Sequence, residues 1–585
     1  MTMAESTKAY MQAYESWVNS DYFDEDTKAE LKAIEGDEAQ IRERFFCDLE
    51  FGTAGLRGVI GAGTNRMNIY VVARATQGLA NYIISKHGQE RGVAIAFDCR
   101  HFSPEFADIA ARVLAANGIK SYRFESLRPT PELSFAVRYL NCIAGINVTA
   151  SHNPPAYNGY KVYWEDGAQI TPPNDIGIML EVKKLSIEDA KIISLEEAKE
   201  KGLYNVIGKE VDDAYIAELK KLVIHQDTID QYAKEIKVVY SPLHGTGNIP
   251  ARRILAELGF TNVYVVPEQE LPDGDFPTVS YPNPEAKEAF ELALKLAKEK
   301  DADLVLATDP DADRLGVYVK DAKSGEYMCL TGNMSGSLLA EYELSQIKAT
   351  RGLPEDGRLI KTIVTTNLAA CIADHYGVKM EECLTGFKFI GQKMLSYEHN
   401  GHGTYLFGFE ESYGCLIGTH ARDKDAIVAT MALCEAATYY KSLGKTLWDA
   451  MIDMYDKYGY WIDDIVTITM EGVDGIEKIK SIMSLLRKDI PQKIGGYDVI
   501  AVRDYDTDIV RNLHTGAETP TFLPKSNVLY FELTDDTWLC VRPSGTEPKI
   551  KFYFGVKGTS LEHAKELSAS FAVEVNKLVQ SLVNA

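Results

Sequence analysis

Short apolar runs alternate with segments of helical period over the first part of the chain. Residues 93–97 are apolar, residues 104–116 carry apolar side chains at helical spacing, and residues 121–124 are short and extended. A further helix begins at residues 128–131, and the apolar run 142–148 follows it. Strands that alternate with helices in this way predict an α/β domain with a mostly parallel sheet.

Two later segments repeat this alternation. In the second segment, strands are predicted at residues 236–240, 263–266 and 303–308, and helices at 249–258 and 285–298. In the third segment, strands are predicted at residues 359–364 and 404–407, and helices at 334–346 and 368–376. The segments share no literal sequence repeat, so only their pattern is repeated.

The last part of the chain has a different order. Strands are predicted at residues 461–470, 528–533 and 538–541, and helices at 475–486 and from 561. We therefore expect three related α/β domains followed by an α+β domain. A charged, helical region at 175–212 sets the first boundary, and the expected domains span residues 1–212, 213–325, 326–455 and 456–585. An amphipathic helix is predicted over residues 1–21.

Length and composition indicate a large soluble protein. The 585 residues are 45% apolar and 25% charged, and no run approaches the roughly 18 apolar residues of a membrane span. The first residues lack the basic-then-apolar layout of a signal peptide. Nine scattered cysteines are typical of reduced thiols. We therefore expect a cytoplasmic protein that does not bind membranes.

The net charge is −23, from 62 Lys and Arg against 85 Asp and Glu. This balance argues against a general nucleic-acid surface, because binding to the phosphate backbone depends on clustered Lys and Arg. An anionic substrate would need locally concentrated positive charge. Loops that combine Arg or Lys with Gly, Ser and Thr are therefore the first candidates for a site.

The strongest candidate loop is Thr149-Ala150-Ser151-His152-Asn153-Pro154, which directly follows the predicted strand 142–148. The proline and the nearby pair Asn158-Gly159 favour turns, so the loop is expected to present Ser151. In α/β sheets, ligands gather at the carboxyl ends of strands. Ser151 is therefore a candidate nucleophile.

A second loop, Asp309-Pro310-Asp311-Ala312-Asp313-Arg314, follows the predicted strand 303–308. In a locally extended loop, the three alternating carboxylates converge on one side. They repel one another unless a cation neutralises them, and hard oxygen ligands suit Mg²⁺. A calcium EF-hand is excluded, because Arg314 stands where that loop needs glycine and Lys320 where it needs glutamate.

Three further loops carry weaker signals. Arg57 lies among glycines, in Gly55-Leu56-Arg57-Gly58. The segment Glu410-Glu411-Ser412 offers acceptors and a donor for sugar hydroxyls, and Arg542-Pro543-Ser544-Gly545-Thr546 can hold a phosphate. With the serine and aspartate loops, these are the parts that phosphoryl transfer between a serine and a sugar phosphate requires.

Other nucleotide and hydrolase motifs are excluded. The segment from Gly386 to Gly391 has the spacing of a P-loop but continues with Gln392-Lys393. Gly245-Thr246-Gly247 lacks the third glycine of a dinucleotide fingerprint. Ser151 is not in a Gly-x-Ser-x-Gly elbow. Neither ATP nor NAD is implied.

With these loops in this order, the sequence resembles the α-D-phosphohexomutases, especially their long phosphoglucomutase-type members. The matching loops run from Arg57 to Lys549 and include Thr-Ala-Ser-His-Asn-Pro, Asp-Pro-Asp-Ala-Asp-Arg, Gly-Phe-Glu-Glu-Ser and Arg-Pro-Ser-Gly-Thr-Glu-Pro. The resemblance implies an α/β fold in which three related α/β domains with mixed sheets and a C-terminal α+β domain surround a central cleft.

The resemblance also implies residue roles. Ser151 would be a phosphoserine, and an oxygen of its phosphoryl group would complete the Mg²⁺ coordination by Asp309, Asp311 and Asp313. Positive charge near the transferring phosphoryl would come from Arg57, Lys161 and Arg314, and Lys161 or His152 would assist proton movement. Sugar hydroxyls would contact Lys388, Glu410 and Ser412. The non-reacting phosphate would be clamped by Arg542, Ser544, Gly545 and Thr546.

The implied reaction interconverts glucose 1-phosphate and glucose 6-phosphate through glucose 1,6-bisphosphate, which would also act as an activator. Close relatives act on mannose or pentose phosphates or synthesise glucose 1,6-bisphosphate, and the sequence does not separate these phosphosugar substrates. Some branches have a histidine where this chain has Gly414, so the general acid/base stays open. A magnesium-dependent phosphatase with Asp309 as nucleophile and a sugar-phosphate sensor are further alternatives. The sequence carries no signal for the oligomeric state.

Overall fold

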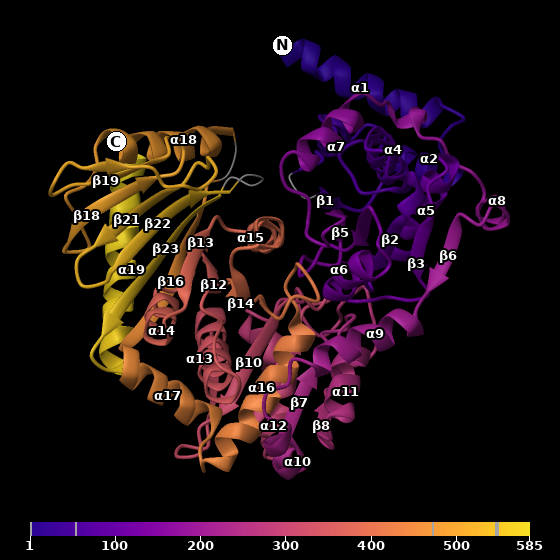
Figure 1. Cartoon of the computed structure of the whole chain (residues 1–585). Coiled ribbons are helices and arrows are strands. Elements are labelled where there is room, and N and C mark those ends of the chain that lie inside the picture. The colour runs from indigo at the N-terminus through magenta and orange to yellow at the C-terminus, as the bar shows by residue number, and fades with distance from the viewer. Residues whose placement is uncertain (1–2, 53–54, 471–472, 545–548, 585) are drawn as a thin grey trace. The chain divides into compact units, whose positions relative to one another are not determined.

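The computed structural model describes residues 3–52, 55–470, 473–544 and 549–584. The chain folds into two compact units (Figure 1). Unit 1 contains Met1–Thr331, Phe387–Phe407 and Ser412–Thr446, and unit 2 contains Gly332–Gly386, Gly408–Glu411 and Leu447–Ala585.

Unit 1 begins with three helices, α1 (Met3–Asn19), α2 (Glu25–Lys32) and α3 (Glu38–Phe45). The predicted amphipathic helix is confirmed in α1, where Tyr10, Tyr14 and Trp17 are buried. The Trp17 ring stacks on Phe23 with their centroids 4.1 Å apart. These aromatic contacts join α1 to the main core of unit 1.

The first sheet of unit 1 is mixed and has the order β1-β5-β4-β2-β3-β6. Its strands are β1 (Gly55–Val59), β2 (Val93–Phe97), β3 (Ser121–Phe124), β4 (Ala144–Val148), β5 (Tyr157–Trp164) and β6 (Tyr204–Ile207). The accompanying helices are α4 (Ile69–Ser85), η1 (Gln89–Arg91), α5 (Ser103–Ala116), α6 (Thr130–Tyr139), α7 (Asn174–Lys183), η2 (Ile187–Asp189) and α8 (Leu195–Glu200). Every residue of β2 and β4 is buried, as expected for parallel strands covered by helices.

Strands β5 and β6 correct two sequence predictions. The pair Asn158-Gly159 favours a turn, but both residues lie in β5, which pairs with β1 and β4. A Cβ at Gly159 would lie 2.4 Å from the Thr149 carbonyl oxygen, so glycine here permits close approach of the serine loop. Strand β6 lies inside the region 175–212 that was predicted to be helical, and it pairs with β3.

The second sheet of unit 1 has the order β11-β10-β9-β7-β8. Its strands are β7 (Lys237–Ser241), β8 (Asn262–Val265), β9 (Leu304–Thr308), β10 (Leu315–Lys320) and β11 (Tyr327–Leu330). The helices of this part are α9 (Lys209–Lys220), α10 (Gln226–Tyr232), α11 (Asn248–Glu257), η3 (Pro267–Gln269), η4 (Lys287–Phe290) and α12 (Glu291–Lys300). The predicted strand ending at Thr308 is confirmed. It forms an antiparallel hairpin with β10, and the aspartate loop connects the two strands.

Unit 1 also includes helices α15 (Phe387–Asn400) and α16 (Ala426–Ser442) and strand β15 (Cys415–Ile417), and β14 (Thr404–Phe409) continues from unit 1 into unit 2. Unit 2 contains α13 (Gly332–Thr350), α14 (Leu368–Tyr376) and α17 (Leu447–Tyr458), with β12 (Gly357–Thr362) and β13 (Lys379–Cys383) paired in parallel. The predicted helices at 334–346 and 368–376 are confirmed in α13 and α14.

The C-terminal part of unit 2 is an eight-stranded sheet with the order β16-β23-β22-β21-β18-β19-β20, in which β17 pairs with β18. Its strands are β16 (Tyr460–Thr469), β17 (Lys493–Ile494), β18 (Tyr497–Asp504), β19 (Ile509–Asn512), β20 (Glu518–Thr519), β21 (Leu529–Leu533), β22 (Trp538–Pro543) and β23 (Lys549–Gly558). Helices α18 (Val473–Lys488) and α19 (Leu561–Asn584) complete this α+β part. Strands β18 and β23 were not predicted.

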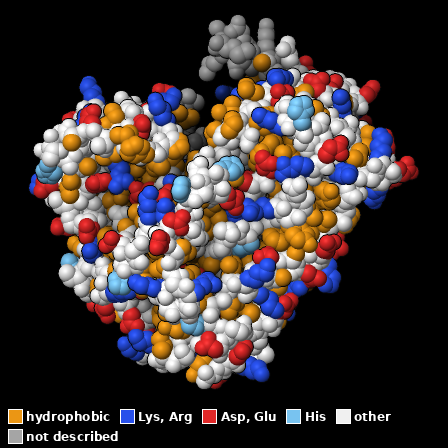
Figure 2. Space-filling view, viewed as in Figure 1, with side chains coloured by type: hydrophobic (Ala, Val, Ile, Leu, Met, Phe, Trp, Pro, Cys, Tyr) orange, Lys and Arg blue, Asp and Glu red, His pale blue; other side chains and the backbone are white. Residues whose placement is uncertain are grey.

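Acidic and basic side chains are interspersed over the face of the molecule drawn in Figure 2. Among the helices in the described ranges, none is both long and apolar enough to cross a membrane.

Candidate active site

Ser151 lies in the loop that follows β4. Its φ of +52° is in the left-handed region. The sequence predicts that the loop presents Ser151 to solvent, but in the structure Ser151 is buried. The burial arises because Ser151 packs against the aspartate loop, where its Oγ donates a 2.9 Å hydrogen bond to Asp309 Oδ2. On the other side, His152 Nδ1 lies 3.1 Å from the same Oγ.

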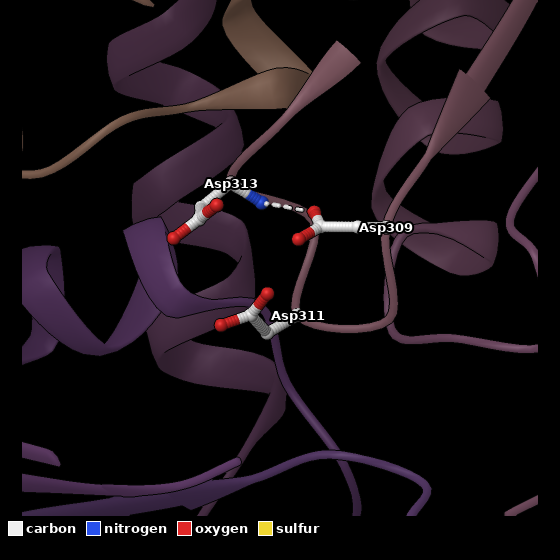
Figure 3. A group of neighbouring side chains, drawn as sticks. All are labelled: Asp309, Asp311 and Asp313. Carbon is white, nitrogen blue, oxygen red and sulfur yellow. Dashed lines mark hydrogen bonds between the residues drawn. The ribbon is translucent and has the colours of Figure 1, made fainter. Parts of the chain in front are cut away.

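The three aspartates of the β9–β10 loop meet as predicted, but not by the predicted geometry. One oxygen of each carboxylate lies within 4.8 Å of the others (Figure 3). The loop is a turn rather than an extended segment, because Ala312 adopts a φ of +51°. Asp309 Oδ1 stabilises this turn by accepting hydrogen bonds from the backbone N–H groups of Asp313 at 3.1 Å and Arg314 at 3.0 Å.

Burial and mutual repulsion separate the acidities of the three carboxyl groups. Burial, with the negative charges of Asp311 and Asp313, raises the pKa of Asp309 well above its ordinary value. Burial and the charge of Asp311 also raise the pKa of Asp313. Burial acts in the same direction on Asp311, but Lys161 and hydrogen bonds outweigh it and hold the pKa of Asp311 below its usual range.

Two buried lysines lie beside the aspartates. Lys161 Nζ, from β5, is 2.8 Å from Asp311 Oδ2, and Lys424 Nζ is 3.0 Å from Asp313 Oδ2. Lys424 also pairs with Asp423 at 2.8 Å. Lys424 was not predicted, because the burial of the charged run Arg422-Asp423-Lys424-Asp425 is known only from the fold.

The charge and the free acceptors of this group fit a hard divalent cation. Four carboxylates, those of the triad and Asp423, are close to two ammonium groups. Buried Oδ1 atoms of Asp311 and Asp313 accept no hydrogen bond within the described part of the chain. Unpaired buried acceptors are costly unless a cation or another donor satisfies them.

The predicted basic residues lie around Ser151. Arg57 on β1 is exposed, and its Nη1 is 3.4 Å from Asn153 Oδ1. Arg314 forms an ion pair with Glu285 at 2.6 Å. Burial, followed by the positive charges of Arg314 and Arg57, lowers the pKa of His152 well below its ordinary value, so its imidazole is neutral near pH 7.

Lys388 and Ser412 belong to neighbouring segments of unit 1. Lys388 is half-buried in the first turn of α15, and burial lowers its pKa. The preceding residue, Phe387, lies with its ring centroid 5.6 Å from Lys424 Nζ. Ser412 is followed by Tyr413, whose carbonyl accepts a 3.0 Å hydrogen bond from the Leu315 N–H just after the aspartate loop.

The other predicted ligands lie in unit 2. Glu410 is buried, and its Oε1 accepts a 2.9 Å hydrogen bond from the Gly386 N–H. Arg542 lies near the end of β22, and the Ser544 N–H donates to the Lys549 carbonyl at 2.7 Å. Gly545 and Thr546 lie outside the described residues.

Thr130, at the start of α6, also contacts the aspartate loop and was not predicted to do so. Its N–H donates to the Asp311 carbonyl oxygen at 2.9 Å, and its Oγ1 donates to Asp311 Oδ2 at 2.9 Å. Asn147 in turn donates to Thr130 Oγ1 at 2.7 Å. The Asp311 carboxylate is therefore oriented by both Thr130 and Lys161.

Ser151 and the aspartate triad both lie in regions that match the models of one protein family. Models of the phosphoglucomutase/phosphomannomutase family match the α/β/α domains I, II and III at residues 48–188, 213–325 and 331–458, and the C-terminal domain at 510–573. The chain belongs to this family. It is an enzyme of the isomerase class, a mutase.

Named relatives agree with this assignment, and two solved structures share the fold. The chain is 40% identical over 509 residues to a phosphoglucomutase of Staphylococcus epidermidis, covering 86% of this chain and 90% of that protein. It is 38% identical over 517 residues to a phosphoglucomutase of Staphylococcus aureus, covering 88% of this chain and 91% of that protein. A putative phosphomannomutase from Thermus thermophilus shares the fold with a TM-score of 0.67 at 22% identity, covering 91% of this chain and 99% of that one. The open form of Paramecium parafusin, a phosphoglucomutase, also shares the fold with a TM-score of 0.67 at 18% identity, covering 92% of this chain and 95% of that one.

Proposed function

We propose that this protein is a phosphoglucomutase that interconverts glucose 1-phosphate and glucose 6-phosphate. The observation that carries the proposal is the 2.9 Å hydrogen bond between Ser151 Oγ and Asp309 Oδ2, which joins a candidate nucleophile to a candidate metal group. The relatives named phosphoglucomutase, at 38–40% identity over most of the chain, support glucose phosphates as substrates.

Ser151 is proposed to carry the transferred phosphoryl group. Ser151 gives this group to the free hydroxyl of the sugar phosphate, which forms glucose 1,6-bisphosphate. After this intermediate has reoriented in the site, Ser151 receives its other phosphoryl group. Asp309, Asp311 and Asp313 would hold Mg²⁺, which would neutralise charge on the phosphoryl oxygens. Arg57 and Arg314 are proposed to add positive charge beside Ser151.

Between the two proton-transfer candidates, the geometry favours His152. Its imidazole is neutral near pH 7, and Nδ1 lies 3.1 Å from Ser151 Oγ, within reach of the proton that Ser151 releases when it is phosphorylated. Lys161 Nζ instead lies 2.8 Å from Asp311 Oδ2, in an ion pair with that carboxylate. We therefore assign Lys161 to orienting Asp311.

The remaining sequence assignments enter the proposal unchanged. Lys388, Glu410 and Ser412 would contact sugar hydroxyls, and Arg542, Ser544, Gly545 and Thr546 would bind the phosphate that is not being transferred. Domains ending near residues 212, 325 and 455 would each supply one of these loops, and the C-terminal domain would supply the phosphate clamp.

The test is turnover of glucose 1-phosphate with Mg²⁺ and a trace of glucose 1,6-bisphosphate, with mannose 1-phosphate and ribose 1-phosphate assayed in parallel. Ser151→Ala should abolish conversion, whereas Ser568→Ala, which changes an equally buried serine on α19, should not. Acid-stable phosphate on Ser151 is expected. Release of inorganic phosphate through a labile acyl-phosphate on Asp309 would instead identify a phosphatase.

A further inference from the structure

Arg100 lies in a polar turn that follows β2. The segment Asp98-Cys99-Arg100 leads from the end of β2 into α5, and the Arg100 side chain is only 1% exposed. A guanidinium that is removed from water in this way is stable only if its charge and its N–H donors are satisfied. Its partners therefore indicate what the buried group does.

The partners of Arg100 are backbone carbonyls of the Ser151 loop. Nη2 donates to the Ser151 carbonyl oxygen at 2.6 Å and to that of Asn153. Nη1 donates to the carbonyl oxygens of Pro154 at 2.9 Å and Tyr157 at 3.0 Å. One side chain thus binds the loop from Ser151 to the start of β5, and the planar fork of arginine makes these four contacts possible.

Arg100 is itself held in place on its other sides. Asp98 Oδ2 lies 3.3 Å from Arg100 Nε, and Asp98 Oδ1 accepts hydrogen bonds from the Arg100 N–H at 3.0 Å and Ser103 Oγ at 2.9 Å. The ring of buried Phe276 lies 5.0 Å from the guanidinium carbon. The guanidinium is therefore a rigid support for the loop rather than a mobile side chain.

The loop needs such support because Ser151 has a φ of +52°. A left-handed conformation is unfavourable for a non-glycine residue and persists only where surrounding contacts impose it. The Ser151 N–H donates to Thr149 Oγ1 at 2.9 Å, and the Ser151 carbonyl accepts from Arg100. With both backbone groups fixed, the Oγ is directed at Asp309.

We propose that Arg100 is a positioning residue for phosphoryl transfer, and this inference rests on the proposed function. Arg100 binds only backbone carbonyls on the loop and acts through the conformation of Ser151. A lysine would keep the positive charge beside Asp98, but its single ammonium group cannot reproduce the two-nitrogen fork. Arg100→Lys therefore separates positioning from charge.

The matched control is Arg123→Lys. Arg123 is a buried arginine on β3 that lies over the Phe97 ring at 4.6 Å and pairs with Asp108 at 2.7 Å, without contact to the Ser151 loop. We expect Arg100→Lys to lower kcat for glucose 1-phosphate by about 10²-fold with little change in KM, as for misplacement of a reacting group. Arg123→Lys should keep both constants near their wild-type values.

A second readout does not depend on turnover. Hydrogen exchange of peptides covering residues 149–158 should accelerate in Arg100→Lys, while peptides from β7 and β9 keep their protection. If the wild-type protein lacks mutase activity, the proposed function fails, yet faster exchange would still show that Arg100 holds the loop. Wild-type kcat, or unchanged exchange, in Arg100→Lys would overturn the inference. Should that variant not fold, Asp98→Asn provides the same comparison and should shift both readouts in the same direction.

Discussion

Ser151 and Asp309 are joined by a hydrogen bond across 158 residues of sequence. Each residue follows the last residue of a buried strand closely, Ser151 after β4 and Asp309 after β9. The candidate nucleophile and the candidate metal ligand are therefore already in contact within unit 1. Changes to the charge of the aspartate group should consequently affect both metal binding and the serine.

Magnesium affinity should increase with pH. Burial and the neighbouring aspartates raise the pKa of Asp309, so a cation that binds there competes with a proton. Binding should tighten as the pH is raised, and it should be accompanied by the release of protons. Isothermal titration calorimetry in two buffers of different ionisation enthalpy measures both effects. An affinity independent of pH, without proton release, would contradict this account.

Lys161→Met should destabilise the metal-free protein strongly. Lys161 is the ammonium group closest to buried Asp311, and loss of one partner of a buried ion pair costs about 3–5 kcal/mol. Saturating Mg²⁺ should restore part of this loss, because the cation replaces the missing charge. Urea denaturation with and without Mg²⁺ measures the change.

The matched control for Lys161 is Lys320→Met. Lys320 pairs with exposed Asp301, and such surface pairs contribute about 0–1 kcal/mol. Equal losses of stability in the two variants would show that the Lys161 pair has no special role.

Gly414→Ala should reduce activity through Lys424. A Cβ at position 414 would lie 2.1 Å from Lys424 Cδ, so the lysine would have to leave its position beside Asp313. This contact also explains why a histidine cannot occupy position 414 while Lys424 keeps this arrangement. We expect Gly414→Ala to lower kcat by about 10²-fold, as for a displaced group in the site.

A double-mutant cycle tests whether this effect runs through Lys424. In a Lys424→Ala background the collision is absent, so adding Gly414→Ala should change kcat little. Additive losses in the double variant would instead show that position 414 acts on its own.

Asp463→Asn should stabilise the protein at neutral and higher pH. Burial raises the pKa of Asp463 to about 7, against the opposing effects of a Thr366 hydrogen bond and the Lys361 charge. Because the folded-state pKa lies above the unfolded value, the wild-type carboxyl stabilises the fold below about pH 4, and this contribution is lost as the pH rises through 7. The loss amounts to no more than about 4 kcal/mol.

Melting temperatures measured from pH 4 to pH 8 check this prediction. The advantage of Asp463→Asn over the wild type should grow up to pH 7 and then level off. Asp464→Asn changes the neighbouring exposed carboxylate and should show a much smaller dependence. A constant difference across this range would contradict the assignment.

The strands that end in polar loops could be predicted from sequence because their apolar runs are short and bounded. Strands β5 and β6 could not. In β5, the local turn preference of Asn158-Gly159 is outweighed by pairing with two neighbouring strands. In β6, a short segment forms a strand by pairing with β3. Both depend on partners distant in sequence.

The site shows the same limit. The loops of Ser151 and Asp309 could be recognised, and the rule that placed them, a polar loop after an apolar strand, also applies to Asp98 and Arg100 after β2. The role of Lys424 has no such local signal, since it depends on a segment more than a hundred residues from the aspartates. The chemistry of a loop can be predicted from its side-chain types, whereas the charged groups that pair with it are known only from the fold.

The hydrogen bonds of the aspartate loop have a consequence for the exchange of segments between relatives. Asp311 accepts hydrogen bonds from Thr130 at the start of α6 and from Lys161 on β5 of the first sheet, and the Pro310 carbonyl accepts one from the Thr246 N–H beside the second sheet. A chimera that replaces only one of these two sheets would join loops that were not selected together. Recombination that preserves activity should therefore transfer residues 1–325 together with the segment that carries Lys424, whose Nζ lies 3.0 Å from Asp313 Oδ2.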